Sequence, residues 1–485
     1  NFKGNWKLLW VAGKSFLEQY HIGLLIDGKF VRGIGGIGKR VSAYRRDRVM
    51  GLQLFNQAYE IVSKTKKEIP EEEFYNFLIS FANAINYYDS IYHLQDLTDI
   101  STLPDYDEVD IYGMRSSFDN IYIGAPVNKE GNPIYYSIPA NFATAKSDGE
   151  RWRFLLHQAS LIAPKYKAQV DMIYAKFLFR NFGVQTIITN SFYRNSGNNE
   201  ILYVVHTLSE EETIARFATG IKRFKMPDEH NYIKIMREVS KTDYLPAQDA
   251  LNTLAEIFKN RRQYTKAVEC LQEAIQRFAD KLNFQNQLMD IVGDWGVFLS
   301  EKPFPAGKNP ILRLRYRNAK IANFEAYQLK VEELLNDIKE YLKSNPPQVE
   351  WEKLDLNDIG SRVVLKNENK YIGEKVAEWK VDLNPKKGYY DKIDNIEVPI
   401  SKAGAYLVTA KIGNGNIARI TLLLNDVAIV QKSNKNSYIN FIADALTGKP
   451  ISNIDIELFV FERQEIDEKL WTPGGRRYNL VTKSV

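Results

Sequence analysis

The spacing of apolar residues divides the chain into two parts. Over about the first 300 residues, apolar positions recur every three to four residues, which is the period of a helix with one buried face. Three segments are predicted to form such helices: "SAYRRDRVMGLQLFNQAYEIVSK" (42–64), "DGERWRFLLHQASLIA" (148–163) and "KYKAQVDMIYAKFLFRNFG" (165–183). In the first segment the apolar face consists of Val49, Leu52, Leu54, Ala58 and Ile61.

Residues that satisfy free backbone groups mark the helix boundaries. Pro70, followed by three glutamates, predicts a helix start, because proline suits the first turn and acids suit the positive end of the helix dipole. Gly183 predicts a helix end. Ser209 with Glu212 forms a capping-box pattern, which predicts that another helix begins there. Between the helices, "APVNKEGNPIYYSIP" (125–139) predicts a small hairpin.

The segment 248–281 has the spacing of a tetratricopeptide repeat. Large residues recur where they would fill the cleft between two helices, and Ala255, Ala267 and Ala274 would let the helices approach. The position usually taken by proline is Ala279. Because one repeat cannot bury its own face, we expect helical pairs at 209–240 and 282–300 to stack on it.

After "EKPFPAGKNP" (301–310) the apolar period changes from 3.6 to 2. In "ILRLRYR" (311–317), apolar residues and arginines alternate, which is typical of a strand with one buried face. Further strands are predicted at about 320–329, 361–366, 374–382, 394–399, 404–412 and 417–424, with a helical insert at 330–344. A second set is predicted at 427–432, 437–443, 454–462 and 478–484. Seven short strands indicate an immunoglobulin-like β-sandwich, whereas four do not complete one.

These periods predict an α+β multidomain chain. We expect a helical, tetratricopeptide-like solenoid over 1–305, which includes the hairpin near 125–139 and the repeat at 248–281. A β-sandwich with the insert 330–344 is expected over 306–426. The start of a second, incomplete sandwich is expected over 427–485.

Composition and charge add little to this picture. The chain of 485 residues is 44% hydrophobic and 26% charged, with a net charge of +5, as is ordinary for a globular protein. Residues 1–48 hold ten Lys and Arg against three Asp and Glu, a balance of +7. Since no single helix concentrates this charge, a solvated surface is favoured over a site for nucleic acid or anionic lipid.

The residues that carry catalysis or bind metals are sparse and scattered. The single cysteine, Cys270, excludes a disulfide framework and a cysteine-based metal cluster, and its position among predicted core residues favours a buried thiol. Pairing with a histidine distant in the sequence is the alternative. No serine-nucleophile motif is present, and the histidines have no metal-binding spacing; they are His21, His93, His157, His206 and His230. We therefore predict no enzyme activity and no catalytic, cofactor-binding or metal-binding residues, and no apolar run reaches the ~18 residues of a membrane span.

The glycine-rich stretch "GIGGIGKR" (33–40) matches two phosphate-binding patterns on paper. In a P-loop the lysine is followed by Ser or Thr, which binds Mg²⁺, but here Lys39 is followed by Arg40. In a dinucleotide fold the glycines open a helix between two parallel strands, but here the helix is expected to begin near Ser42, after the glycines. The stretch is interpreted as a flexible loop, and a nucleotide-dependent enzyme is the least favoured hypothesis.

Two stretches resemble a known family. "ISKAGAYLVTAKI" (400–412) contains a G-x-Y-L-V strand, and "LLLNDVAIVQKSNKNSYINFIADALTGKPISNIDIELFVFE" (422–462) has a strand that ends at Asp426. A D-x-x-T-G-K-P motif follows, formed by Asp444, Thr447, Gly448, Lys449 and Pro450. Together these patterns are similar to consecutive macroglobulin domains of the bacterial alpha-2-macroglobulin family, and "LRLRYRNAKIANFEAYQL" (312–329) resembles the opening strands of such a domain. "RDRVMGLQLFNQA", "LPDYDE", "GAPVNKEGNPIYYSIP" and "DGERWRF" resemble the N-terminal region of a large planctomycete-type branch.

The resemblance implies an extracytoplasmic protein that inhibits proteases. Members offer a bait segment whose cleavage triggers collapse around the protease, and many carry a thioester formed by C-x-E-Q. This sequence departs from that motif, because Cys270 is followed by Leu271, Gln272 and Glu273. Since the chain begins without Met and ends abruptly at Val485, we expect it to be the N-terminal part of a longer protein, with bait and thioester elsewhere.

The expected partners are proteases or other envelope proteins, and neither nucleic acid, nucleotide nor cofactor is expected. The alternative hypothesis is a non-enzymatic envelope scaffold that binds other proteins through its solenoid and sandwiches.

Overall fold

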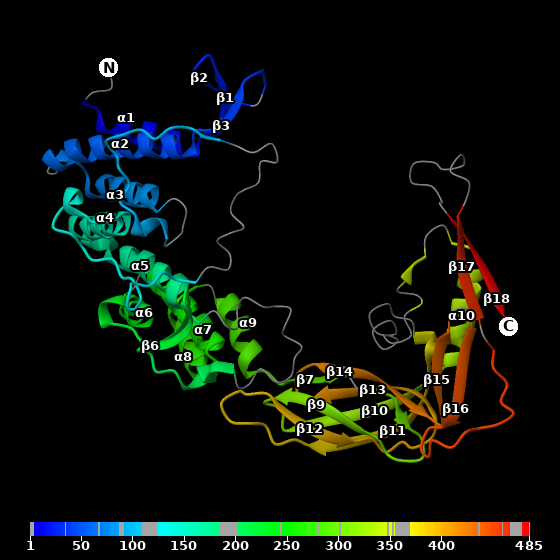
Figure 1. The fold of residues 1–485 in the computed structure, drawn as a ribbon. Helices are drawn as coiled ribbons and strands as arrows, with labels where there is room; N and C mark the ends of the chain where they lie inside the picture. The colour runs from blue at the N-terminus through cyan, green and yellow to red at the C-terminus, as the bar shows by residue number, and fades with distance from the viewer. Residues whose placement is uncertain are drawn as a thin grey trace. The chain divides into compact units, whose positions relative to one another are not determined.

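Helices dominate the N-terminal residues and strands the C-terminal ones, so the expected α+β class is confirmed (Figure 1). The computed structural model describes residues 4–33, 35–65, 68–86, 92–108, 124–184, 202–242, 245–279, 281–299, 302–346, 349–351, 354, 369–434, 437–457, 459–465 and 478–484. The chain divides into two units, Asn1–Gln285 and Asn286–Val485.

In the first unit, most helices pack against the next helix in the chain (Figure 1). They are α1 (Trp6–Glu18), α2 (Tyr44–Lys64), α3 (Glu71–Ile85), α4 (Asp148–Ile162), α5 (Lys167–Phe182), α6 (Tyr232–Ser240), α7 (Leu245–Asn260) and α8 (Tyr264–Arg277). α9 (Lys281–Val292) spans the division between the units. Side chains of Asn5, Ser147 and Asn231 accept hydrogen bonds from the first free amides of α1, α4 and α6. Apolar faces of these helices form the core, in which Phe55, Phe77 and Phe81 are inaccessible to solvent.

A four-stranded sheet interrupts the helices near the N-terminus, within the part of the chain predicted as a helical domain. Its order is β2-β1-β3-β4, formed by β1 (Ile22–Ile26), β2 (Lys29–Arg32), β3 (Lys39–Ser42) and β4 (Asp107–Glu108). β1 and β2 join through Asp27 and Gly28, both with positive φ (50° and 72°). This is the turn that suits a two-residue hairpin, and Asp-Gly is among the sequence signals for it.

The prediction that a helix begins at Ser209 and Glu212 is wrong. Glu212 begins a hairpin of β5 (Glu212–Phe217) and β6 (Gly220–Lys225), and α6 follows only afterwards. The Ser209 amide does donate to Glu212 Oε2 (3.0 Å), so the local contact forms without a helix. Likewise, the pair expected at 282–300 contains α9 and then strand β7 (Trp295–Phe298). The predicted hairpin at 125–139 is reduced to one bridge, between Val127 and Pro133.

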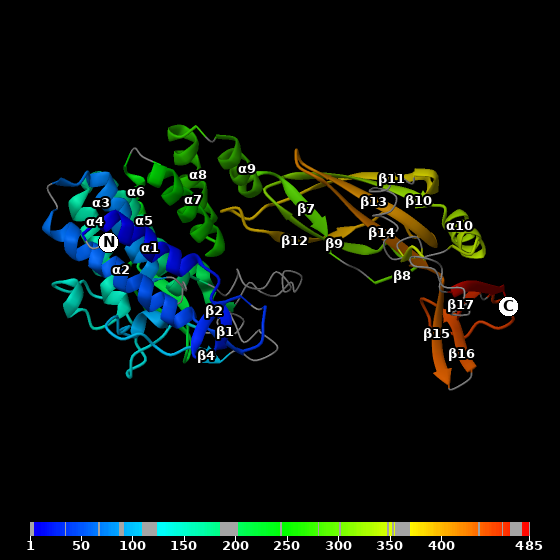
Figure 2. The same ribbon diagram turned by 90° about the horizontal axis from the view of Figure 1, so that it is seen from above.

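The second unit contains two sheets that enclose one core (Figure 2). The larger has the order β11-β10-β13-β14-β8 and the smaller β12-β9-β7. Their strands are β8 (Phe304–Pro305), β9 (Ile311–Arg317), β10 (Ile321–Leu329), β11 (Ile372–Asp382), β12 (Lys392–Glu397), β13 (Gly404–Ile412) and β14 (Ile417–Asn425). In β9, Leu312, Leu314 and Tyr316 are buried and Arg313 is exposed, as the alternation predicts.

The predicted helical insert forms α10 (Val331–Lys343), whereas the strand predicted at 361–366 lies outside the described residues. Two antiparallel pairs follow β14: β15 (Val427–Asn434) with β16 (Ser437–Asp444), and β17 (Phe459–Glu465) with β18 (Tyr478–Ser484). The strand predicted at 454–462 therefore starts later, at Phe459, where the pairing with β18 begins. No helix in the described ranges is both long and apolar enough to cross a membrane.

Candidate functional site

The glycine-rich stretch connects two strands of a β-sheet and does not lie at a helix start. It connects β2 to β3, and both of these strands pair antiparallel with β1. Gly33 and Gly36 have φ values of 107° and 131°, and the Gly33 amide donates to the carbonyl oxygen of Ile22 (3.0 Å). α2 begins only at Tyr44, after β3. The stretch therefore lacks the helix N-terminus on which both phosphate-binding patterns depend.

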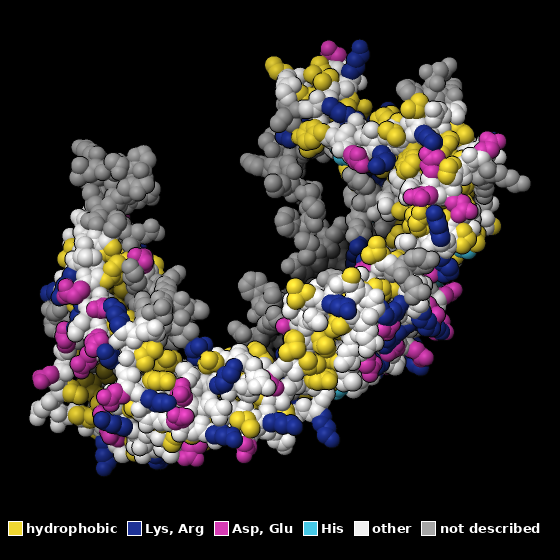
Figure 3. Space-filling model, turned by 180° about the vertical axis from the view of Figure 1, so that it is seen from behind, with side chains coloured by type: hydrophobic (Ala, Val, Ile, Leu, Met, Phe, Trp, Pro, Cys, Tyr) yellow, Lys and Arg dark blue, Asp and Glu magenta, His cyan; other side chains and the backbone are white. Residues whose placement is uncertain are grey.

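Several cations of the basic N-terminal stretch are paired with acids. Arg32 forms a bidentate pair with Asp47 (2.8 Å for both contacts), and His21 Nδ1 lies 2.9 Å from the same carboxylate, whose side chain is buried. Asp107, some 60 residues later in the sequence, binds Arg45 (2.6 Å), and Glu108 binds Lys39. On the face drawn in Figure 3, basic and acidic side chains are interspersed. Asp107 and Glu108 lie outside residues 1–48, so they offset two charges of the local excess of +7, which the sequence order alone does not reveal.

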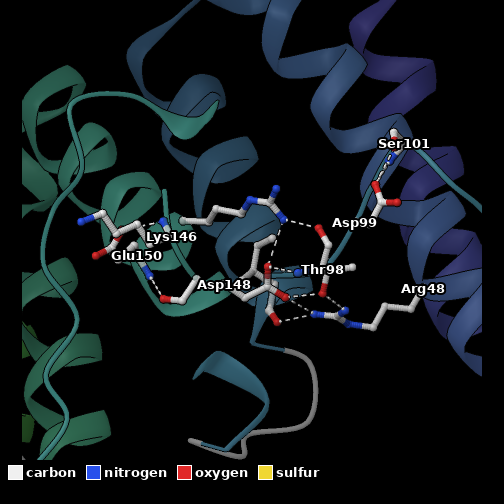
Figure 4. A network of polar contacts seen from close by, with 10 residues as sticks. Arg48, Thr98, Asp99, Ser101, Lys146, Asp148 and Glu150 are labelled. Carbon is white, nitrogen blue, oxygen red and sulfur yellow. Dashed lines mark hydrogen bonds and ion pairs between the residues drawn. The ribbon is translucent and has the colours of Figure 1, made fainter. Parts of the chain in front are cut away.

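Asp148, in the "DGERWRF" segment, is the centre of a buried polar network (Figure 4). Its carboxylate accepts hydrogen bonds from Arg48 (3.1 Å), Arg151 (3.0 Å) and the Thr98 amide (3.2 Å) and hydroxyl (2.5 Å). The network joins α2, the loop at Thr98 and the start of α4. The charged members of the network bind one another, so the network holds these three segments together.

Cys270 is placed unfavourably for nucleophilic chemistry. The side chain is buried on α8, and burial raises the pKa of its thiol to about 11, although Arg237 Nη1, 3.8 Å from the sulfur, acts in the opposite direction. The thiol is therefore protonated at neutral pH. Gln272 lies two residues along the same helix, and residues at that spacing do not face each other.

The histidines do not gather into a metal site. Within the described ranges, no group of three or more His, Cys, Asp or Glu side chains could hold a metal ion. His21 contacts Asp47, and His230 shares a hydrogen bond of 2.6 Å with the Tyr174 hydroxyl and stacks on Tyr135. Burial lowers the pKa of His230, so its ring is neutral at neutral pH.

A pocket of about 470 Å³ lies between α4, α5 and the segment leading into α6. Its lining combines aliphatic side chains with Arg153, Tyr174 and several acids and lysines. Arg153 stacks on the Tyr174 ring, 3.5 Å from its centroid. The sequence did not reveal this site, because its members lie up to 100 residues apart and most belong to ordinary amphipathic helix patterns.

The D-x-x-T-G-K-P motif forms a closed turn beside the start of β15. Asp444 Oδ1 accepts hydrogen bonds from the Thr447 amide (2.7 Å) and hydroxyl (2.6 Å), and Gly448 has a φ of 69°. The Ala445 amide donates to the carbonyl oxygen of Asp426 (2.8 Å). Asp426 is the single residue between β14 and β15, so the turn is anchored to the point where one sheet ends and the next begins.

Comparisons with known proteins give limited similarity. No family model matches the chain, and no curated protein matches it. Among solved structures, native alpha-2-macroglobulin from Escherichia coli spanning domains MG0-NIE-MG1 is 15% identical with a TM-score of 0.23, and covers 39% of this chain. A second structure of that protein, spanning NIE-MG1, is 16% identical with a TM-score of 0.24, over 40% of this chain and 83% of the other.

The chain spans 57% of the length of the first of these structures. With TM-scores this low, function has to be inferred from the residues of the chain itself.

Proposed function

We propose that this chain is part of an alpha-2-macroglobulin-like extracytoplasmic protein that traps proteases or defends the cell envelope. The main support is the junction at Asp426, where the sequence resemblance coincides with a strand-to-strand connection of one residue. The turn around Gly448 is anchored to that junction by the Ala445 amide. So short a connection suits tandem sandwich domains that transmit a change in one domain to the next.

We propose that the chain binds other proteins and catalyses no reaction. Cys270 is a buried, protonated thiol, and His21 and His230 contact acids and aromatic rings. A protease trap needs no reactive group in the domains that support its bait segment. The expected partners are therefore proteins.

We also propose that α7 and α8 form a tetratricopeptide-like pair within the helical unit. The three small residues of the repeat pattern, Ala255, Ala267 and Ala274, are all buried, and α7 packs against both α6 and α8. Small buried residues allow the close helix approach that the repeat requires.

Incubation of the full-length protein with subtilisin tests the trapping role. We expect a stable complex in which the protease cleaves a small peptide substrate but is protected from a protein-sized substrate. Subtilisin blocked at its active-site serine is the control and should form no such complex, because it cannot cleave a bait segment. Simple digestion, without retained protease, would contradict trapping.

That negative result would favour the scaffold alternative, which the pocket between α4, α5 and α6 supports by offering a place for a ligand or partner.

A further inference from the structure

The pocket between α4, α5 and the start of α6 contains one guanidinium group, that of Arg153, which forms no ion pair with the described residues. Among the described residues, Arg153 forms no hydrogen bond and no ion pair within 4.0 Å, although the charges of Glu229 and Asp171 act on it. Its Nε atom is buried without a hydrogen-bond partner, and its contact is the face of Tyr174. Because the Nε atom is closed to solvent, a ligand would accept from the terminal Nη atoms, which are not among the buried atoms without a partner.

Most other charged residues of the pocket form ion pairs, either with one another or with a neighbour outside it. Lys167 pairs with Asp171 (2.5 Å), Lys234 pairs with Asp228, and Glu238 pairs with Lys241 (2.7 Å). Glu229 lies 3.2 Å from His230, whose ring is neutral at neutral pH because it is buried. Arg153 is thus the lining cation without a carboxylate partner among the described residues.

The remaining lining is largely aliphatic. The aliphatic residues are Ile138, Leu156, Leu161, Val170 and Ile235, and His157 and Ser160 complete the lining. Ile138 and Leu161 are 42% and 59% exposed, so apolar surface continues to the rim of the pocket. The volume, about 470 Å³, lies within the range of pockets that hold small ligands.

We propose that this pocket binds a monocarboxylate with an apolar body, such as the C-terminal residue of a peptide ending in leucine. The planar guanidinium of Arg153 matches a carboxylate with two parallel hydrogen bonds, and Tyr174 beneath it holds the plane of the group. The aliphatic wall covers the side chain of the ligand. This inference is independent of protease trapping, since it concerns a site within the helical unit.

Calorimetric titration of the 485-residue chain tests the assignment with three probes. These are the peptide acetyl-Gly-Ser-Gly-Ser-Leu with a free carboxylate, the same peptide as its C-terminal amide, and N-acetyl-leucine. We expect the free acid to bind at least tenfold more tightly than the amide, because the amide loses the charge-assisted pair. Tighter binding of the peptide than of N-acetyl-leucine would identify a protein C-terminus as the source, and equal binding a small free acid; both support the assignment.

Arg153→Met removes the charge and retains an apolar stem over Tyr174. It should weaken binding of the acid at least tenfold and leave that of the amide unchanged, with Arg153→Lys between the two. Arg216→Met, which removes an exposed positive charge of β5, is the matched control and should change nothing. Equal binding of acid and amide to the unaltered chain would overturn the proposal without any variant, as would full affinity for the acid in folded Arg153→Met.

Discussion

At the scale of single residues, Asp148 shows how buried charge organises the helical unit. Its side chain is 1% exposed, and those of Arg48 and Arg151 are 13% and 10% exposed. A buried ion network compensates for lost hydration only while every member has its partner. Asp148 therefore fixes three segments that lie up to 100 residues apart: α2, the loop at Thr98 and α4.

We expect Asp148→Ala to destabilise the helical unit by about 3–5 kcal/mol, because two largely buried guanidinium groups lose their carboxylate. The measurement is denaturant unfolding of the chain followed by circular dichroism. Asp249→Ala is the control, since Asp249 pairs with Lys176 at an exposed site and should cost less than about 1 kcal/mol. Equal stability of the two variants would show that the network is not structural.

At the scale of elements, two turns depend on residues with positive φ. Asp27 and Gly28 close β1 against β2, and Gly448 closes the turn after β16. No other group lies within 4 Å of a β-carbon built on Gly448, so the space around it would accept a side chain. The constraint at Gly448 is therefore the backbone conformation itself.

Gly448→Ala should destabilise the turn by about 1 kcal/mol, because a residue with a β-carbon is strained in the left-handed region. Hydrogen exchange of the β15 and β16 amides should accelerate accordingly. Lys449→Ala, at the exposed neighbouring position, leaves the backbone unstrained and serves as the control. Unchanged exchange in Gly448→Ala would mean that the turn adopts another conformation.

At the scale of the whole molecule, the two-sheet core is self-contained. Among the described residues, its buried members lie between Phe298 and Leu424, and none comes from β15 to β18. A separate cluster of Leu342, Val349 and Leu480 connects α10 to β18. The sandwich should therefore fold without the residues after Asp426, while α10 should lose part of its cover.

A chain truncated after Asp426 tests this division. We expect hydrogen-exchange protection of β13 and β14 to match that of the 485-residue chain, and the amides of α10 to exchange faster. The 485-residue chain carrying Leu480→Ala should reproduce the effect on α10 alone, because Leu480 supplies the contact from β18. Loss of protection in β13 would show that the sandwich depends on the following strands.

The sequence could predict those features that depend on local periodicity. The alternation in 311–317 gave the buried face of β9, and Pro70 with its following acids marked the start of α3. The helix predicted from Ser209 and Glu212 did not form, because here the same side-chain contact precedes a strand. Asp27-Gly28 is a sequence signal for a hairpin. It was not used, because the glycines that follow it predict a loop.

The sequence by itself determined the α+β class, the change of period near residue 310 and the failure of the glycine stretch as a phosphate loop. Only the tertiary structure decided that Asp107 and Glu108 pair with Arg45 and Lys39, and that Arg153 lines a pocket and forms no ion pair within the described ranges. The physical reason is the distance along the chain over which each interaction acts. Periodicity and turn preferences act between neighbours along the chain, whereas burial and charge pairing depend on which distant segments the fold brings together.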